Sequence, residues 1–146
     1  MKGKCLAIAI ATLALGFAPQ MAQAQTLKAS ASINKAGAKG DLGVLITESG
    51  LAARQSVSYS ITTYAGAIYT CNGVAQPQVG GLEEVDFGMT ASSKGAIRNT
   101  VVVMLPESPC DIGQTSKITK ASYTNVTVTD ITDGTSVALG NYSASF

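Results

Sequence analysis

Hydrophobic and polar residues alternate along much of the chain after about residue 25. In Gln55–Tyr64 the side chains of Val57, Tyr59 and Ile61 share one parity, and the residues between them are serines. Successive side chains of a β-strand point to opposite faces of a sheet, so this pattern predicts a strand with one buried and one wet face. The apolar set is expected to lie in the core.

The segment Ile97–Leu105 repeats the pattern and adds an apolar end. Ile97, Val101 and Val103 share one face with Leu105, and Arg98 lies opposite. Near the end, Val102 and Met104 make both faces apolar. Strands that are covered on both faces have such runs, so this end is expected to lie deeper in the sheet.

A third strand is predicted at Tyr123–Ile131, which is rich in Thr and Val, with Val126 and Val128 in the core. Shorter candidates are Leu27–Ile33, Leu42–Glu48, Ala67–Cys71, Val85–Thr90, Ser136–Leu139 and Asn141–Phe146. Turn signals separate these segments at Asn72-Gly73, Gln76–Gly81 and Asp133-Gly134.

No sustained helical stripe follows the first 24 residues, and only Leu51–Arg54 has the length of a single turn. Strands at a spacing near ten residues are typical of sandwiches and small barrels. A membrane barrel would need aromatic girdles and a lipid-facing apolar band, whereas this chain has Ser and Thr on its polar faces and no Trp. The sequence predicts an all-β protein: one small antiparallel β-sandwich, immunoglobulin-like in the broad sense.

The first 24 residues have the order of a secretory signal peptide. Lys2 and Lys4 precede the uncharged run Leu6–Phe17, and Ala22-Gln23-Ala24 places small residues where a signal peptidase reads them. The run is too short to span a bilayer. Cleavage is expected between Ala24 and Gln25, which leaves a domain of residues 25–146, exported to the periplasm or the medium, without a membrane span.

Removing the signal changes the charge balance. Eight Lys and Arg remain against nine Asp and Glu, so the net charge of the domain is about −1. The cations are scattered singly between Lys28 and Lys120. A nucleic-acid partner is therefore excluded, because its recognition needs a basic patch.

Two cysteines remain after the predicted cut, Cys71 and Cys110. In an oxidising compartment such a pair is typical of a disulfide. The alternative is a metal site with two thiolates, but it needs two more soft or imidazole ligands, and the chain has no His. A disulfide across a loop of about 40 residues would contribute ~4 kcal/mol in the chain-entropy model.

The lack of His also excludes His-dependent nucleophile systems and nearly all catalytic zinc sites. Glu83, Glu84 and Asp86 could serve glycoside hydrolysis. A chain this short has little room for a sugar-sized cleft, so they are interpreted as charges on a strand edge that discourage edge pairing. No enzyme activity is predicted.

Calcium is the more serious alternative for the acidic residues. Asp130 and Asp133, together with Asp111 or the Glu83–Asp86 group, offer hard oxygen ligands. The run Asp130–Gly134 lacks the alternating acidic positions of an EF-hand loop, and turn chemistry alone explains Asp133-Gly134. We therefore predict no metal and no cofactor, while a weak calcium site near Asp130 and Asp133 stays open.

Three segments resemble a group of small secreted bacterial β-proteins of unknown function. They are SVSYSITTYAGAIYTCNG (Ser56–Gly73), CDIGQT (Cys110–Thr115) and ASYTNVTVTDITDG (Ala121–Gly134). The loop lacks the two prolines that follow the second Cys in that group, and the last turn ends in Asp-Gly where the group has Asn-Gly. The resemblance implies an exported, disulfide-linked β-domain, and no activity or site residue.

The expected function is that of an exported, non-enzymatic envelope or extracellular domain with a structural, adhesive or binding role towards an unknown protein or glycan. One alternative is a secreted inhibitor or effector that acts through the loop Pro106–Asp111, since a loop held by a disulfide loses little entropy on binding. Another is a pilus-type subunit completed by a strand of its neighbour.

Overall fold

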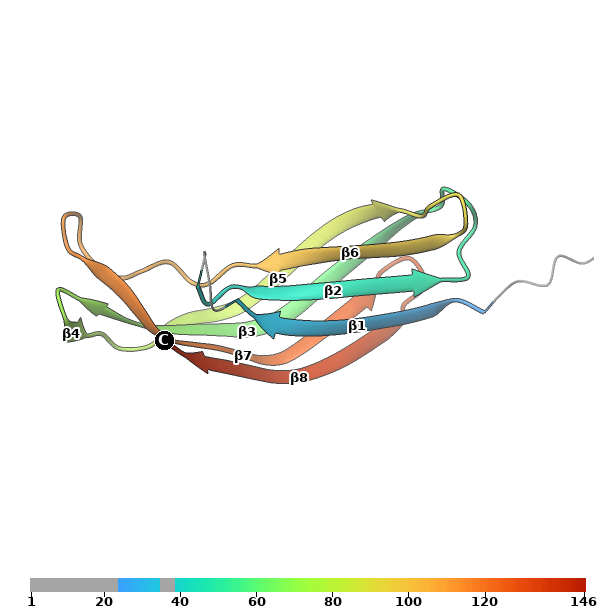
Figure 1. Cartoon of the computed structure of the whole chain (residues 1–146). Helices are drawn as coiled ribbons and strands as arrows, with labels where there is room; N and C mark the ends of the chain where they lie inside the picture. The colour runs from blue at the N-terminus through green and yellow to red at the C-terminus, as the bar shows by residue number, and fades with distance from the viewer. Residues whose placement is uncertain (1–23, 35–38) are drawn as a thin grey trace, which may run out of the picture.

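The computed structural model describes residues 24–34 and 39–146 (Figure 1). The predicted signal peptide lies outside the described residues except for Ala24. The described residues form strands and no helix. In chain order the strands are β1 (Thr26–Ile33), β2 (Leu42–Ser49), β3 (Ser56–Cys71), β4 (Val74–Ala75), β5 (Val79–Thr90), β6 (Ala96–Val103), β7 (Ser116–Asp130) and β8 (Ser136–Ser145).

The strands form two antiparallel sheets. The smaller sheet has the order β1-β2-β6. In the larger sheet β7 lies between β3 and β8, and both β4 and β5 pair with the other side of β3. The larger sheet curls over the smaller one (Figure 1). The predicted all-β class with antiparallel sheets is confirmed.

Several predicted strands prove to be parts of longer ones. Gln55–Tyr64 and Ala67–Cys71 were expected separately, but β3 continues through Ala65 and Gly66 because both residues pair with β5 on one side and β7 on the other. The expected break at Gln76–Gly81 ends at Gln78, since β5 begins at Val79. The turn at Asn72-Gly73 is confirmed, with positive φ angles of 50° and 84°.

The core lies between the two sheets. It contains Leu42, Val44 and Ile46 from the smaller sheet, packed with residues of β3 and β7 from the larger one. Val101 of β6, which was predicted to lie in the core, is half-buried. The other predicted core residues are buried: Val57, Tyr59, Ile61, Val103, Val126 and Val128.

The prediction for the end of β6 is wrong. Val102 is 51% exposed and Met104 is 73% exposed. In the described residues β6 pairs only with β2, so it is an edge strand, and its outward face has no covering layer. Val103, on the inward face of the same strand, is 1% exposed.

Val103→Ala should lower the free energy of unfolding by about 1–3 kcal/mol, because it removes buried methyl groups and leaves a cavity. The matched change Val102→Ala, on the wet face of the same strand, should cost less than about 0.5 kcal/mol. Urea denaturation of both variants measures the difference. Equal losses would contradict the assignment of the two faces.

The predicted disulfide is present. Cys71 ends β3, and Cys110 lies in the loop between β6 and β7, with a Cα–Cα distance of 5.4 Å. The bond therefore ties a strand of the larger sheet to the connection that leaves the smaller sheet, 39 residues further along the chain.

The double variant Cys71→Ser/Cys110→Ser should lose about 2–4 kcal/mol of stability, since the bond restricts the unfolded chain. The denaturant midpoint should fall while the far-ultraviolet circular dichroism of the native state stays the same. Reduction of the wild type should have the same effect. Unchanged stability would mean that packing alone holds the domain together.

Candidate functional site

The two candidate sites of greatest interest lie at opposite ends of β3. Tyr59 is near its beginning and is aligned with Asp130 of β7, whereas Cys71 is its last residue. Twelve residues of strand span ~40 Å at about 3.3 Å per residue. The end with Asp130 is called the acidic end below, and the end with the Cys71–Cys110 bond is called the disulfide end.

Three carboxylates converge at the acidic end. Glu48 comes from β2, Asp130 is the last residue of β7, and Asp133 lies in the β7–β8 turn; one oxygen of each lies within 4.8 Å of the others. They are called the acidic cluster. Glu48 is 3% exposed and Asp130 is 1% exposed, whereas Asp133 is exposed. The cluster thus joins a strand of the smaller sheet to the end of the larger one.

Hydrogen bonds use one oxygen of each carboxylate. The hydroxyl of Tyr59 donates to Oε2 of Glu48 at 2.5 Å. The backbone N–H of Thr132 donates to Oδ1 of Asp130, and that of Thr135 donates to Oδ1 of Asp133, each at 2.7 Å. The other oxygens of the two buried carboxylates, Oε1 of Glu48 and Oδ2 of Asp130, have no hydrogen-bond partner in the described part of the chain.

The electrostatics of the cluster oppose three simultaneous negative charges. Burial raises the pKa of Glu48, the bond from Tyr59 lowers it, and the charges of Asp130 and Asp133 raise it again. Two like charges at about 4–5 Å repel by about 3–4 kcal/mol at an effective dielectric constant near 20. Burial and the neighbouring carboxylates thus disfavour the ionised form of Glu48, and a proton or a bound cation would relieve the repulsion.

The sequence singled out two members of this cluster and missed the third. Asp130 and Asp133 lie together as the calcium alternative required, but Asp111 and the Glu83–Asp86 group are not part of the cluster. Glu48 has the same strand parity as the buried Leu42, Val44 and Ile46. A carboxylate at a core-facing position of a strand is the signal that could have revealed it.

The acidic residues of β5 lie on an edge strand, as interpreted from the sequence. In the described residues β5 pairs along its length only with β3. Glu84 and Asp86 are on its exposed face, whereas Glu83 is half-buried on the other. Because they point to different faces, Glu83 and Glu84 do not form the facing pair that glycoside hydrolysis requires.

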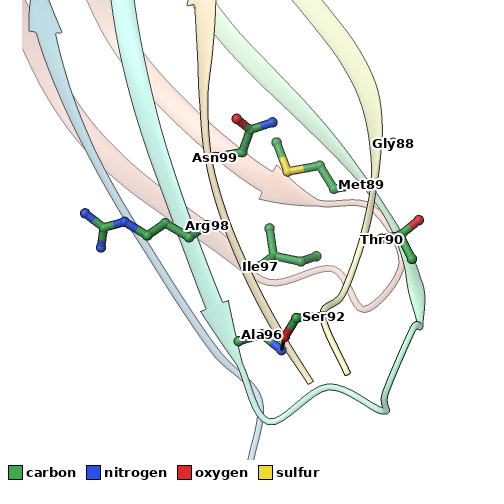
Figure 2. A pocket seen from close by; sticks show the side chains of 8 residues that line it. All are labelled: Gly88, Met89, Thr90, Ser92, Ala96, Ile97, Arg98 and Asn99. Carbon is green, nitrogen blue, oxygen red and sulfur yellow. Dashed lines mark hydrogen bonds between the residues drawn. The ribbon is translucent and has the colours of Figure 1, made fainter. Parts of the chain in front are cut away.

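A groove opens between β5 and β6, the edge strands of the two sheets (Figure 2). It has a volume of about 550 Å³ and includes Met89, Ser92, Ile97 and Asn99 in its lining. Figure 2 shows Met89 and Ile97 pointing into the space between the strands, whereas Arg98 points away from it. The groove offers apolar side chains next to two strand edges.

The loop between β6 and β7, residues 104–115, is held by hydrogen bonds before and after its tip at Ile112. The hydroxyl of Tyr69 donates to the carbonyl of Pro106 at 2.7 Å, and the Ser108 and Ser116 hydroxyls are hydrogen-bonded at 2.6 Å. Beyond the tip, the backbone N–H of Thr115 donates to Oδ1 of Asn72 at 2.8 Å. The loop is therefore preorganised by hydrogen bonds as well as by the disulfide.

The tip of this loop carries an apolar side chain in full contact with solvent. Ile112 lies two residues after Cys110 and has the largest exposed fraction of the exposed large hydrophobic residues described. Val74 and Met104 are also exposed; Val74 follows Cys71 by three positions, and Met104 precedes Pro106 by two.

The five tyrosines do not gather on one exposed face. Tyr59 and Tyr123 are fully buried, Tyr69 and Tyr142 are half-buried, and only Tyr64 is exposed. Strand packing accounts for most of them.

No protein-family model matches this sequence, and the search of curated proteins finds no significant match. In the described part of the chain, no helix has the length and apolar character that a membrane crossing requires.

Proposed function

We propose that this chain is an exported, non-enzymatic β-sandwich of immunoglobulin-like topology that binds a protein partner through its disulfide end. The strand order supports the topology. With the two-residue β4 set aside, the order β1-β2-β6 corresponds to strands A, B and E of an immunoglobulin domain, and β8-β7-β3 to strands G, F and C. The strand β5 then takes the place beside C that C′ has in variable-type domains.

Two observations support export. The disulfide suits an oxidising compartment such as the periplasm or the extracellular medium. The first 24 residues have the order of a signal peptide, with cleavage between Ala24 and Gln25. The resemblance to small secreted β-proteins agrees with this location but supplies no function.

The observation that carries the binding role is Ile112 on its pinned loop. An apolar side chain in water costs free energy, and burying it in a partner recovers that cost. A loop already held in one conformation by a disulfide and hydrogen bonds loses little conformational entropy on binding. An exposed apolar anchor on a rigid loop is a suitable centre for an interface.

The chemistry of this end favours a protein partner with an apolar pocket. The exposed side chain of Ile112 suits an apolar pocket, whereas the charge balance of the domain gives no attraction to nucleic acid. The same loop would serve an adhesive module and an inhibitor or effector. The two roles differ only in whether the partner loses an activity when it is bound.

A photoreactive amino acid at Asp111 should cross-link a partner in the organism that produces the protein. Replacing Ile112 by Ser should abolish that cross-link, while Leu82→Ser, an exposed apolar residue of β5, should leave it unchanged. Neither change should alter the free energy of unfolding by more than about 0.5 kcal/mol, because both side chains are exposed. A cross-link that is independent of Ile112 would contradict the proposal, and a lack of protease inhibition at micromolar concentration would exclude a protease inhibitor.

A second candidate function is a pilus-type strand acceptor, which the β5–β6 groove favours. Its occupant would be an extended strand of another copy of this chain. The N–H of Thr100 is bonded to the side chain of Asn99 at 2.9 Å and so is not used by β2. Thr100→Pro therefore removes an edge donor at little cost to the sheet.

Light scattering after size exclusion should then show oligomers that depend on concentration for the wild type and monomers for Thr100→Pro. A wild type that stays monomeric at all concentrations would exclude the pilus-type role. Glu84 and Asp86 on the exposed face of β5 would favour a basic incoming strand.

A further inference from the structure

We propose that the acidic cluster of Glu48, Asp130 and Asp133 binds one Ca²⁺ ion, which links the two sheets at the end opposite to the disulfide. This site is independent of the proposed binding loop, which lies at the other end of β3. Sequence patterns alone favoured no metal, because the run Asp130–Gly134 lacks the alternating acidic positions of an EF-hand loop and turn chemistry explains Asp133-Gly134.

The oxygens that would hold the ion are those that the protein leaves without a partner. Oε1 of Glu48 and Oδ2 of Asp130 are buried and accept no hydrogen bond from the described residues. A buried carboxylate oxygen without a donor is costly, since it has lost its water and gained nothing in exchange. Asp133 supplies a third carboxylate within 4.8 Å from the solvent side.

The rest of the cluster holds these oxygens in place. Tyr59 fixes the Glu48 carboxylate through Oε2. The N–H of Thr132 and that of Thr135 fix Asp130 and Asp133 through their Oδ1 atoms. Each carboxylate therefore has one oxygen that orients it and a second that can face a ligand, which is the arrangement of a preorganised metal site.

A positive ligand would balance the charges that the three carboxylates bring within 4.8 Å of one another. Glu48 is surrounded by the Tyr59 hydroxyl and by the charges of Asp130 and Asp133, while its neighbours in the paired strands, Leu27 and Ile97, are apolar. A proton shared between Glu48 and Asp130 would remove one charge, but the remaining charge of that pair would still lie close to Asp133. A divalent cation satisfies all three carboxylates.

The ligand set selects calcium. Three carboxylates with solvent access at Asp133 supply only hard oxygens, and neither His nor a free thiol is nearby to favour zinc. Calcium accepts six to eight oxygens in irregular geometry, including water, whereas magnesium demands a near-ideal octahedron. Carboxylates from a strand end and a turn suit the more tolerant ion. Calcium sites of extracellular domains have dissociation constants of about 0.1–1 mM.

Isothermal titration of the exported protein, with its disulfide intact, should give one Ca²⁺ per chain. Its melting temperature should rise with CaCl₂ and fall in EGTA, because the ion binds only the folded cluster. Magnesium chloride provides the comparison for ion identity. Stronger or equal binding of Mg²⁺ would overturn the assignment to calcium.

Asp130→Asn and Glu48→Gln remove a charge but keep an oxygen for the Thr132 N–H or the Tyr59 hydroxyl. Each should weaken Ca²⁺ binding more than about tenfold. In EGTA each variant should melt above the wild type, because the repulsion within the cluster is reduced. The control Asp86→Asn, on the exposed face of β5, should change neither result.

The direction of the change in melting temperature in EGTA separates a calcium site from a purely structural role. Residues that only support the fold would lower the melting temperature in EGTA when they are replaced. Absence of binding heat and of any melting shift at about 10 mM Ca²⁺, ten times the weakest affinity expected, would overturn the proposal. So would variants of Glu48 and Asp130 that bind calcium as the wild type does.

Discussion

Two tyrosine side chains buried between the sheets fix how the sheets face each other. Tyr59 and Tyr123 belong to the larger sheet and are fully buried, so each hydroxyl needs a partner inside the protein. Tyr59 donates to Glu48 of β2, and Tyr123 bonds to the carbonyl oxygens of Gly40 and Val103 at 2.9 and 3.2 Å. Apolar packing allows small shifts of one sheet over the other, but these hydrogen bonds can form at only one relative position of the two sheets.

The hydrogen bond that satisfies the Tyr59 hydroxyl also places a carboxylate in the core at the acidic end. A buried hydroxyl bonded to a carboxylate brings the charge of Glu48 into the core, beside Asp130. Burial and the neighbouring acidic groups raise the pKa of Glu48, and the same burial keeps Tyr59 protonated as a donor by raising its pKa. Two oxygens of this buried network have no hydrogen-bond partner, which costs free energy that a bound ligand would recover.

The two ends of the domain are therefore held by different means. At the disulfide end a covalent bond and backbone hydrogen bonds hold a loop whose apolar tip faces solvent. At the acidic end the sheets meet through charged groups. The proposed partner binding and the proposed ion binding lie at different ends of the domain, because the strand β3 separates the two sites by most of its length.

The sequence by itself determined the all-β class, the buried faces of β3 and β7 and the cysteine pair, because side-chain alternation and turn chemistry are local. It placed Tyr59 and Val128 in the core correctly. It could not show that Val102 faces solvent, since parity tells which side chains share a face and not what covers it. Only the tertiary structure brought Glu48 next to Asp130, 82 positions later in the chain. That meeting depends on how two sheets pack, and the packing is a property of the whole core.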